Sequence, residues 1–284
     1  MKTIRERFRR YWPLTKPLQT GLLLSTGLAG FMSARCPVTH WYDFIGLAVS
    51  LFLSIAGSTI INMWYDRDID AMMNRTRLRP LAEGRITPIQ ALRFGLVLSV
   101  LGVGMSVAMS PLYGLIIFAG LFFDAVVYTI WLKRRTCWSI IWGGISGGMP
   151  ILAGRAFGTG QIDGIGILLA LAVLFWIPTH IMTFSMRYDK DYRSARIPTF
   201  PSTYGSRFTR RTIAVSSVLA ALSISAAGIL IGMDWGFVRL LAVLCAGLIL
   251  LAAATAFRPS ERVNYGLFKY ASLFMLSAMI LLSI

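Results

Sequence analysis

Charged residues are scarce in this sequence of 284 residues. They make up 14% of the chain, whereas an ordinary soluble domain contains about 25%. Hydrophobic residues make up 56%, and the chain has 26 Gly, 8 Trp and 13 Met. This composition is typical of an integral membrane protein, and it excludes a disordered tail and a typical cytosolic enzyme.

Cysteine and histidine are also rare, with three and two residues. Cys36, Cys137 and Cys245 are far apart, lie in or beside apolar runs and form no CxxC pair. We therefore interpret them as small apolar packing residues and exclude a secreted disulfide scaffold. His40 and His180 are too few to build a His-rich metal site.

Acidic residues number only 12, against 28 Lys and Arg, which gives a net charge of +16. Such a charge can indicate a nucleic-acid partner, but in so apolar a chain it also follows from membrane topology. The positions of the cations decide between the two interpretations.

Nine apolar runs are long enough to cross a bilayer as helices, and the alternating pattern of barrel strands is absent. The runs cover residues 18–35, 43–63, 91–109, 111–131, 138–155, 164–186, 212–232, 237–257 and 266–284. The first run is longer than the apolar part of a signal peptide and no cleavage motif follows it, so we expect it to be retained.

The cations alternate with these runs. All but three of the 28 Lys and Arg residues precede the first run or follow an even-numbered one; the exceptions are Arg35, Arg155 and Arg239. By the positive-inside rule, this pattern predicts a cytoplasmic N-terminus and a multi-pass protein of the cell membrane. It also explains the positive charge without nucleic acid, so we expect no nucleic-acid partner.

Two connections on the basic side, residues 63–88 and 187–211, are longer and more polar than a turn requires. Asn62, Asp66 and Asp70 lead into the first at intervals of four, which places them on one face if the helix continues. Carboxylate and amide oxygens are ligands that Mg²⁺ prefers, and the arginines that follow suit phosphate. The alternative is a solvated face on which aspartates offset arginines.

Asp189 and Asp191 stand in the second connection, again beside cations. The fourth run ends in Tyr128, Lys133 and Arg134, which can be an interfacial anchor or a phosphate clamp. Together these features suggest an amphipathic diphosphate whose head lies at the cytoplasmic surface and whose tail lies in a cavity between helices. Metal and cations would then stabilise the departing diphosphate.

These residues resemble the intramembrane aromatic prenyltransferase superfamily and, within it, the protoheme IX farnesyltransferase (haem O synthase) family. The resemblance rests on Asn62-x-x-x-Asp66-x-x-x-Asp70, on Met73-Asn-Arg-Thr76 and Arg79-Pro-Leu81, and on Tyr128–Thr136 followed by Gly143-Gly144. It continues through Trp176–His180, Asp191-Tyr192 and Ile197-Pro198, and Leu14–Pro17 also fits. It covers roughly residues 14–205, and the last three helices agree only in number and hydrophobicity.

The resemblance implies a single all-α transmembrane domain, residues 1–284, with about nine helices around a central cavity whose active site faces the cytoplasm. It implies transfer of a farnesyl group from farnesyl diphosphate to a vinyl group of haem B, with addition of water, to give haem O and diphosphate. Asn62, Asp66 and Asp70 would hold one Mg²⁺, and Asp189 or Asp191 a second. The implied diphosphate and substrate contacts are Tyr128, Lys133, Arg134, Arg75, Arg79 and, at the cavity mouth, Lys16 near a haem propionate.

Two positions stay open. The family often has a Pro-His pair where this chain has Thr179-His180, and His180 would ligate haem iron, relay a proton or simply pack within the bundle. Asp124 lies four residues before Tyr128 on the same face, with either a functional role or a buried hydrogen bond. The acceptor could instead be a quinone precursor, a chlorin or a glycerol-phosphate lipid. A secondary transporter fits less well, because the carboxylates gather at one membrane face. Nothing in the sequence fixes the oligomeric state.

Overall fold

The computed structural model describes residues 4–35, 41–258 and 260–284, and every regular element in them is a helix. The predictions for Lys2, Cys36 and His40 lie outside the described residues. The elements are α1 (Ile4–Tyr11), η1 (Trp12–Thr15), α2 (Pro17–Met32), α3 (Trp41–Tyr65), α4 (Arg67–Met72), α5 (Pro88–Met109), α6 (Pro111–Phe122), η2 (Phe123–Leu132), α7 (Ser139–Thr159), α8 (Gly164–Arg187), α9 (Asp189–Ser194), α10 (Phe200–Ile231), α11 (Trp235–Phe257) and α12 (Glu261–Ser283). The predicted all-α class is confirmed.

Seven helices in this part of the chain are long and apolar enough to cross a membrane. They are α3, α5, α6 continued by η2, α8, α10, α11 and α12. The predicted spans 18–35 and 138–155 fall on α2 and α7, which are helices but do not reach this measure. Helix α2 has 16 residues, which extend only about 24 Å, and glycines, serines and Pro150 dilute the apolar content of α7. The count of nine spans stays a prediction.

Close packing between α2 and α7 explains their composition. A Cβ on Gly30 would lie 2.1 Å from the carbonyl oxygen of Ile151, and one on Gly154 would lie 1.9 Å from that of Gly27. No side chain fits at either position, so the two backbones touch as small residues allow in membrane bundles. These two helices therefore lie inside the bundle, where they can form the wall of a central cavity.

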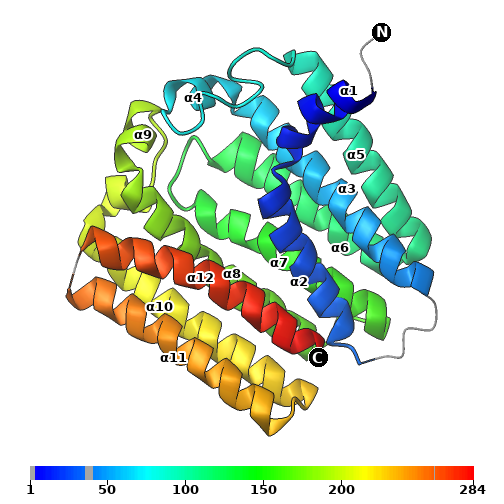
Figure 1. The fold of residues 1–284 in the computed structure, drawn as a ribbon, viewed down its shortest axis with the longest axis vertical. Helices are drawn as coiled ribbons and strands as arrows, with labels where there is room; N and C mark the ends of the chain where they lie inside the picture. The colour runs from blue at the N-terminus through cyan, green and yellow to red at the C-terminus, as the bar shows by residue number, and fades with distance from the viewer. Residues whose placement is uncertain (1–3, 36–40, 259) are drawn as a thin grey trace.

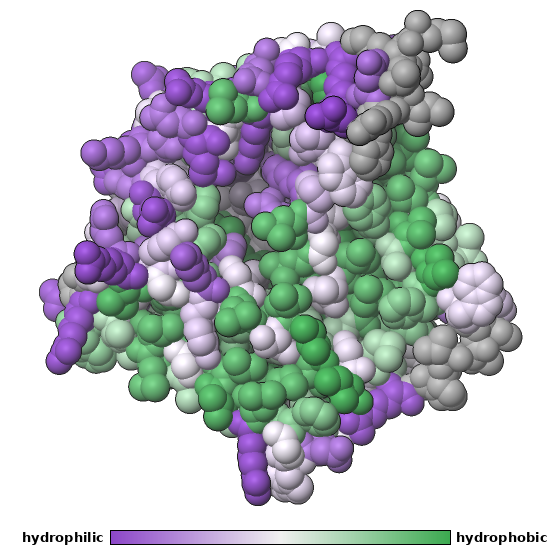
Figure 2. Space-filling view, in the orientation of Figure 1, coloured by the Kyte–Doolittle hydropathy of each residue, from purple (hydrophilic) through white to green (hydrophobic). Residues whose placement is uncertain are grey.

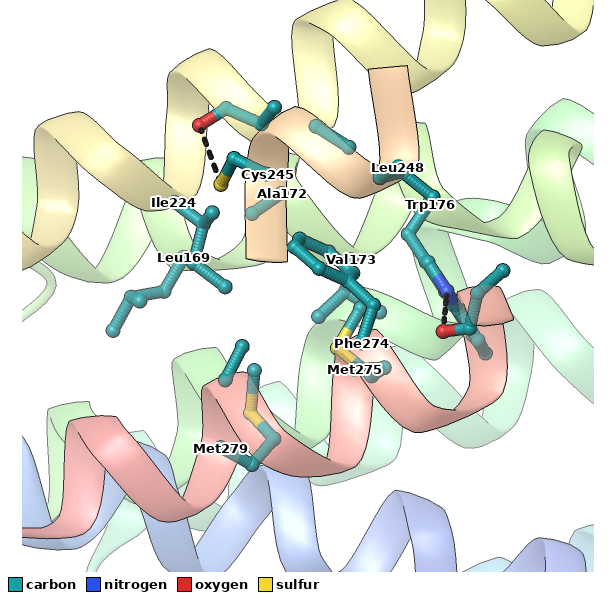
Figure 3. Packing of buried hydrophobic residues seen from close by; sticks show 14 of the residues in the cluster. Leu169, Ala172, Val173, Trp176, Ile224, Cys245, Leu248, Phe274, Met275 and Met279 are labelled. Atoms are coloured by element: carbon teal, nitrogen blue, oxygen red, sulfur yellow. Dashed lines mark hydrogen bonds between the residues drawn. The ribbon is translucent and has the colours of Figure 1, made fainter. Parts of the chain in front are cut away.

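Helices α10 and α12 pack against α8, and α11 packs against both of them (Figure 3). Leu169, Val173 and Trp176 of α8 belong to one buried cluster with Leu248 of α11 and Phe274 of α12. The indole N–H of Trp176 also donates a hydrogen bond of 2.7 Å to the carbonyl oxygen of Ala271. Interiors packed in this way resist rearrangement, so α8 offers a rigid support for side chains that point away from the cluster.

One end of the molecule is polar. Helices α1, α4 and α9 lie there in Figure 1, and Figure 2 shows hydrophilic residues over that end and hydrophobic residues over most of the remaining face. The two long predicted connections meet at this end, because Ile69 and Met73 pack against Ala195 and Ile197. In Figure 2 the surface is hollowed just below the polar end.

Candidate active site

A cavity of about 460 Å³ opens below the polar end, between α2, α3, α6 with η2, α7, α8 and α12. The polar lining at its mouth comes from helix ends and connections: Lys16, Asn62, Asp70, Arg75, Arg79, Tyr128, Lys133 and Tyr192. Its apolar lining comes from helix interiors: Leu22, Ile55, Ile117, Met149, Ile177 and Ile181. The cavity thus has a charged mouth and a mostly apolar interior, which also contains Ser58, Asp124 and His180. This is the polarity of a site for an amphipathic molecule.

The first acidic motif keeps its predicted spacing through the end of α3. The Asp66 N–H donates to the Asn62 carbonyl at 3.0 Å, and the Asp70 N–H donates to the Asp66 carbonyl at 2.8 Å. The helical ladder therefore continues across the boundary between α3 and α4. The three residues are 9%, 1% and 5% exposed in chain order. The alternative of a solvated face of aspartates does not describe this motif, since all three are buried.

Each aspartate of this motif has a cation from another segment. Lys133, which follows η2, forms an ion pair with Asp66, and Arg79 binds both oxygens of Asp70 at 2.8 and 2.7 Å. Burial opposes the positive charge of Lys133, but the adjacent Tyr128 and Asp66 outweigh it and raise the pKa of the amine. The mouth therefore presents Asp70 together with the cations Arg79 and Lys133, whereas the buried Asp66, which pairs with Lys133, is not among the lining residues of the cavity.

Lys16 stands in the same mouth, between η1 and α2, with a left-handed backbone (φ 44°). Burial, together with the charges of Arg79 and Lys133, lowers its pKa to about 7. An incoming anion would reverse this shift, because it stabilises the protonated amine.

The segment that carries Tyr128 and Lys133 is not a regular α-helix. Through η2 the helical turns widen, so that the Lys133 N–H donates to the Tyr128 carbonyl, five residues back, at 2.8 Å. Such widened turns are rare in proteins overall, but those that occur are frequently found at functional sites. Asp124, Tyr128 and Lys133 all line the cavity as a result, and a Cβ on Gly143 would lie only 3.0 Å from the Tyr128 ring. The sequence predicts an ordinary helix here.

The second acidic motif lies beside the first but not in the cavity lining. Asp191 accepts a hydrogen bond of 3.3 Å from the Arg75 N–H, and Asp189 forms an ion pair of 2.6 Å with Arg193. The Arg75 guanidinium lies 4.8 Å from the ring centre of Phe184, a cation–π distance. The structure thus brings the two predicted motifs together through Arg75.

The fit to a divalent cation rests on oxygens that lack partners. In the described part of the chain no three His, Cys, Asp or Glu side chains lie close enough to hold a metal ion. One buried carboxylate oxygen in each motif, Oδ1 of Asp66 and Oδ1 of Asp189, nevertheless has no hydrogen-bond donor among the described residues. A buried acceptor of this kind is costly and calls for an explanation. These two hard oxygens suit Mg²⁺.

Arg134 turns away from the cavity. Its guanidinium binds both oxygens of Asp68 at 2.7 Å and the Tyr65 carbonyl at 2.7 Å, and it does not line the cavity. This bidentate pair lowers the pKa of Asp68. Lys133 and Arg134 are thus neighbours in sequence with different surroundings, and only Lys133 faces the cavity.

His180 and Asp124 lie among the deeper lining residues. The imidazole stacks between Trp176 and Phe268, with ring centres 4.8 and 4.6 Å away, and its Nδ1 is 3.3 Å from the Ser272 hydroxyl. Asp124 accepts a hydrogen bond from Ser58.

Several lining residues were not predicted. Ser58 continues the four-residue spacing one turn before Asn62, so the same periodicity could have revealed it. Tyr192 adjoins Asp191 within the second motif and could have been found by adjacency. Phe268 comes from α12 and has no local signal, because only the tertiary fold brings it to His180.

Comparison with known proteins gives concordant results. Residues 23–277 match the UbiA prenyltransferase family. A protoheme IX farnesyltransferase of Archaeoglobus fulgidus is 39% identical over 265 residues, which are 92% of this chain and 89% of that protein. One of Desulforudis audaxviator is 36% identical over 94% of this chain and 85% of its own length.

Solved structures share the fold at low identity. A digeranylgeranylglyceryl phosphate synthase matches with a TM-score of 0.81 and 18% identity, over 98% of both chains. A UbiA homolog from Archaeoglobus fulgidus bound to GPP and Mg²⁺ matches with a TM-score of 0.71 and 16% identity, over 97% of this chain and 100% of the other.

Proposed function

This chain belongs to the UbiA prenyltransferase family, and we propose that it transfers a farnesyl group from farnesyl diphosphate to a vinyl group of haem B. The products are haem O and diphosphate. The protein is a membrane prenyltransferase, as its family and its apolar helices indicate. The choice of farnesyl donor and haem acceptor follows relatives at 36–39% identity over most of the chain.

The observation that supports this function most strongly is the polarity of the cavity. Lys16, Arg75, Arg79 and Lys133 give its mouth four cations that can bind a diphosphate, while the apolar interior can take an isoprenoid tail. Arginine at phosphate sites offers two parallel N–H donors, and lysine a compact point charge. A transporter site would instead be expected near the bilayer midplane on broken helices.

Mg²⁺ fits the oxygens of the acidic motifs. Asn62, Asp66 and Asp70 would hold one ion and Asp189 or Asp191 a second, with phosphate oxygens completing the set. When bound, the metal supplies positive charge to the diphosphate as the donor ionises. The unpartnered Oδ1 atoms of Asp66 and Asp189 support this assignment.

The residues of the mouth favour cleavage of the donor. As the bond between farnesyl C1 and the diphosphate oxygen breaks, the leaving group takes the electron pair, and Lys133, Arg79 and Lys16 stabilise the added charge. Tyr128 lies below Lys133, whose ammonium is 5.5 Å from the ring centre, and would contact the same group. Arg134 would act indirectly, because it binds Asp68 beside the mouth and does not contact the diphosphate itself.

C1 then bonds to the terminal carbon of the vinyl group, and the positive charge passes to the adjacent carbon. A water oxygen adds to that carbon and releases one proton, which gives the hydroxyethylfarnesyl side chain. His180 is the lining imidazole that would accept this proton or ligate the haem iron. Lys16 at the mouth would face a haem propionate when the diphosphate has left.

The proposed location is the cell membrane, with the cavity mouth on the cytoplasmic side. The gathering of cations at the ends of alternate helices supports this orientation. Labelling single cysteines placed at Arg75 or Arg193 tests it: we expect modification only from the cytoplasmic side, and labelling from outside would contradict the orientation.

The function is tested by incubating the purified protein with farnesyl diphosphate, Mg²⁺ and haem B, with the product identified by mass. A haem enlarged by one farnesyl group and one hydroxyl group is expected. Parallel reactions replace haem B with a quinone precursor or a glycerol-phosphate lipid. Prenylation of one of these acceptors, with haem B unchanged, would contradict the proposal.

A further inference from the structure

A second basic region lies outside the cavity. Four arginines, Arg134, Arg135, Arg193 and Arg196, line a surface depression of about 540 Å³ together with Ile197, Pro198 and Ser202. The depression adjoins the cavity, because Ile197 and Pro198 belong to the linings of both. None of the four arginines lines the cavity itself.

Two of these arginines are neutralised and two are not. Arg134 is paired with Asp68, and Arg193 with Asp189. Arg135 and Arg196 are exposed, and neither forms an ion pair with any of the described residues. The depression therefore presents an excess of two positive charges, which suits an anion such as a phosphate group.

The backbone holds one of these cations under strain. Arg196 has a left-handed conformation, φ 53°, directly after α9. Glycine or asparagine usually occupies this position at a helix end, because the side chains of other residues make the left-handed conformation unfavourable. Pro198 restricts the backbone of the residue before it, Ile197. Residues held in sparsely populated backbone conformations gather at functional sites and ligand clamps, which supports a binding role for Arg196.

Three exposed aromatic side chains stand close in the chain to residues that line the depression. Trp138, Tyr204 and Phe208 are each 45% exposed. The Trp138 indole donates a hydrogen bond of 3.0 Å to the Tyr204 hydroxyl, and the Tyr204 and Phe208 rings lie 5.1 Å apart. Trp138 follows Arg135 by three residues and Tyr204 follows Ser202 by two. Tyr and Trp gather at the level of lipid headgroups.

We propose that this depression is a binding site for an anionic phospholipid. Arg135 and Arg196 bind the headgroup phosphate, and the upper acyl chain lies along Trp138, Tyr204 and Phe208. Basic pockets between helices on the cytoplasmic side suit such headgroups. A free phosphate could use the two arginines but not the aromatic surface, so the combination favours a lipid. The bound lipid would brace Ile197 and Pro198, which form part of the cavity wall.

The test is a titration of the full-length protein in a neutral detergent with phosphatidylglycerol or phosphatidylcholine, followed by mass spectrometry of the intact complexes. The variant Arg135→Gln/Arg196→Gln should bind phosphatidylglycerol about 30-fold more weakly, at about 1 kcal/mol for each interfacial arginine. The matched control Arg77→Gln/Arg93→Gln removes two exposed cations elsewhere and should bind within about twofold of the unmodified protein. If both variants lose the same affinity for phosphatidylglycerol, the loss reflects general surface charge and the proposed site is wrong.

A second measurement needs no charge removal. Phosphatidylglycerol with brominated chains should quench tryptophan fluorescence, and Trp138→Phe should abolish the part that saturates with this lipid. The same quenching in Trp138→Phe would overturn the aromatic half of the site. Displacement of the lipid by inorganic phosphate or diphosphate at equal concentration would identify a free-anion site and overturn the lipid assignment. All of these measurements are independent of prenyl transfer.

Discussion

Lys133 is the residue whose replacement separates the roles of the mouth most clearly. Its ammonium pairs with Asp66, which is 1% exposed, and its own side chain is 18% exposed. In Lys133→Met the Asp66 carboxylate keeps only Arg134, at 3.9 Å. Loss of one partner of a buried ion pair costs about 3–5 kcal/mol, so we expect a clear fall in thermal stability.

Donor binding should fall for a different reason. A hydrogen bond to a charged group contributes about 1.5–3 kcal/mol, which corresponds to a loss of about 10- to 150-fold in affinity for farnesyl diphosphate. Affinity for haem B should stay nearly unchanged. The double variant Lys133→Met/Asp66→Asn removes the orphaned charge, so it should regain most of the stability and none of the donor affinity.

The assay combines thermal unfolding with binding titrations of both substrates in detergent. Arg155→Met serves as a matched control, since Arg155 is buried, is paired with Asp163 and is not among the residues that line the cavity. The control should lose stability but keep donor affinity in the folded fraction. Recovery of donor affinity in the double variant, or loss of haem binding in Lys133→Met, would refute the separation of the two sites.

Three further outcomes follow from the geometry. Because the pKa of Lys16 is lowered to about 7, the empty site loses this charge as the pH rises, and binding of the donor must then take up a proton. The Kd for farnesyl diphosphate should therefore increase up to about tenfold per pH unit above about pH 7.5. In a titration series, Lys16→Met should flatten this dependence. His180→Ala should spare donor affinity and change the haem absorption spectrum or haem affinity; normal turnover with an unchanged spectrum would make His180 a packing residue. Arg155 lowers the pKa of Asp163 in the folded protein. The pair therefore stabilises the fold above the pKa that this carboxyl group has in the unfolded chain, and this stabilisation is lost as the pH falls through its lower pKa in the folded protein. Arg155→Ala should abolish that acid-dependent part of thermal stability.

Local patterns in the sequence predicted much of this architecture. Apolar length identified the helices, and the spacing of Asn62, Asp66 and Asp70 identified a stripe that the backbone ladder preserves. The two long connections were both predicted on the basic side, and in the structure they meet at one end of the bundle. These features depend on periodicity and on polarity, which are properties of short segments.

Pairing between segments could not be predicted in the same way. Nothing local indicates that Lys133 meets Asp66 while the adjacent Arg134 meets Asp68. The widened turns of η2 decide that difference, and helix propensity does not encode them. The stacking of Phe268 on His180 likewise depends on the packing of α12 against α8. Both cases involve contacts between residues far apart in the chain.

The most direct test of the central claim compares Asp70→Asn with the unmodified protein in haem prenylation. Asp70 lines the cavity and is held by Arg79, so the exchange keeps its shape and removes one negative charge from the proposed metal ligands. Folded protein, measured by thermal unfolding, is matched between samples, and diphosphate release and farnesylated haem are quantified together. The account predicts that both products are lost in the variant and appear in equal amounts in the unmodified protein. Full turnover of haem B by folded Asp70→Asn would contradict it.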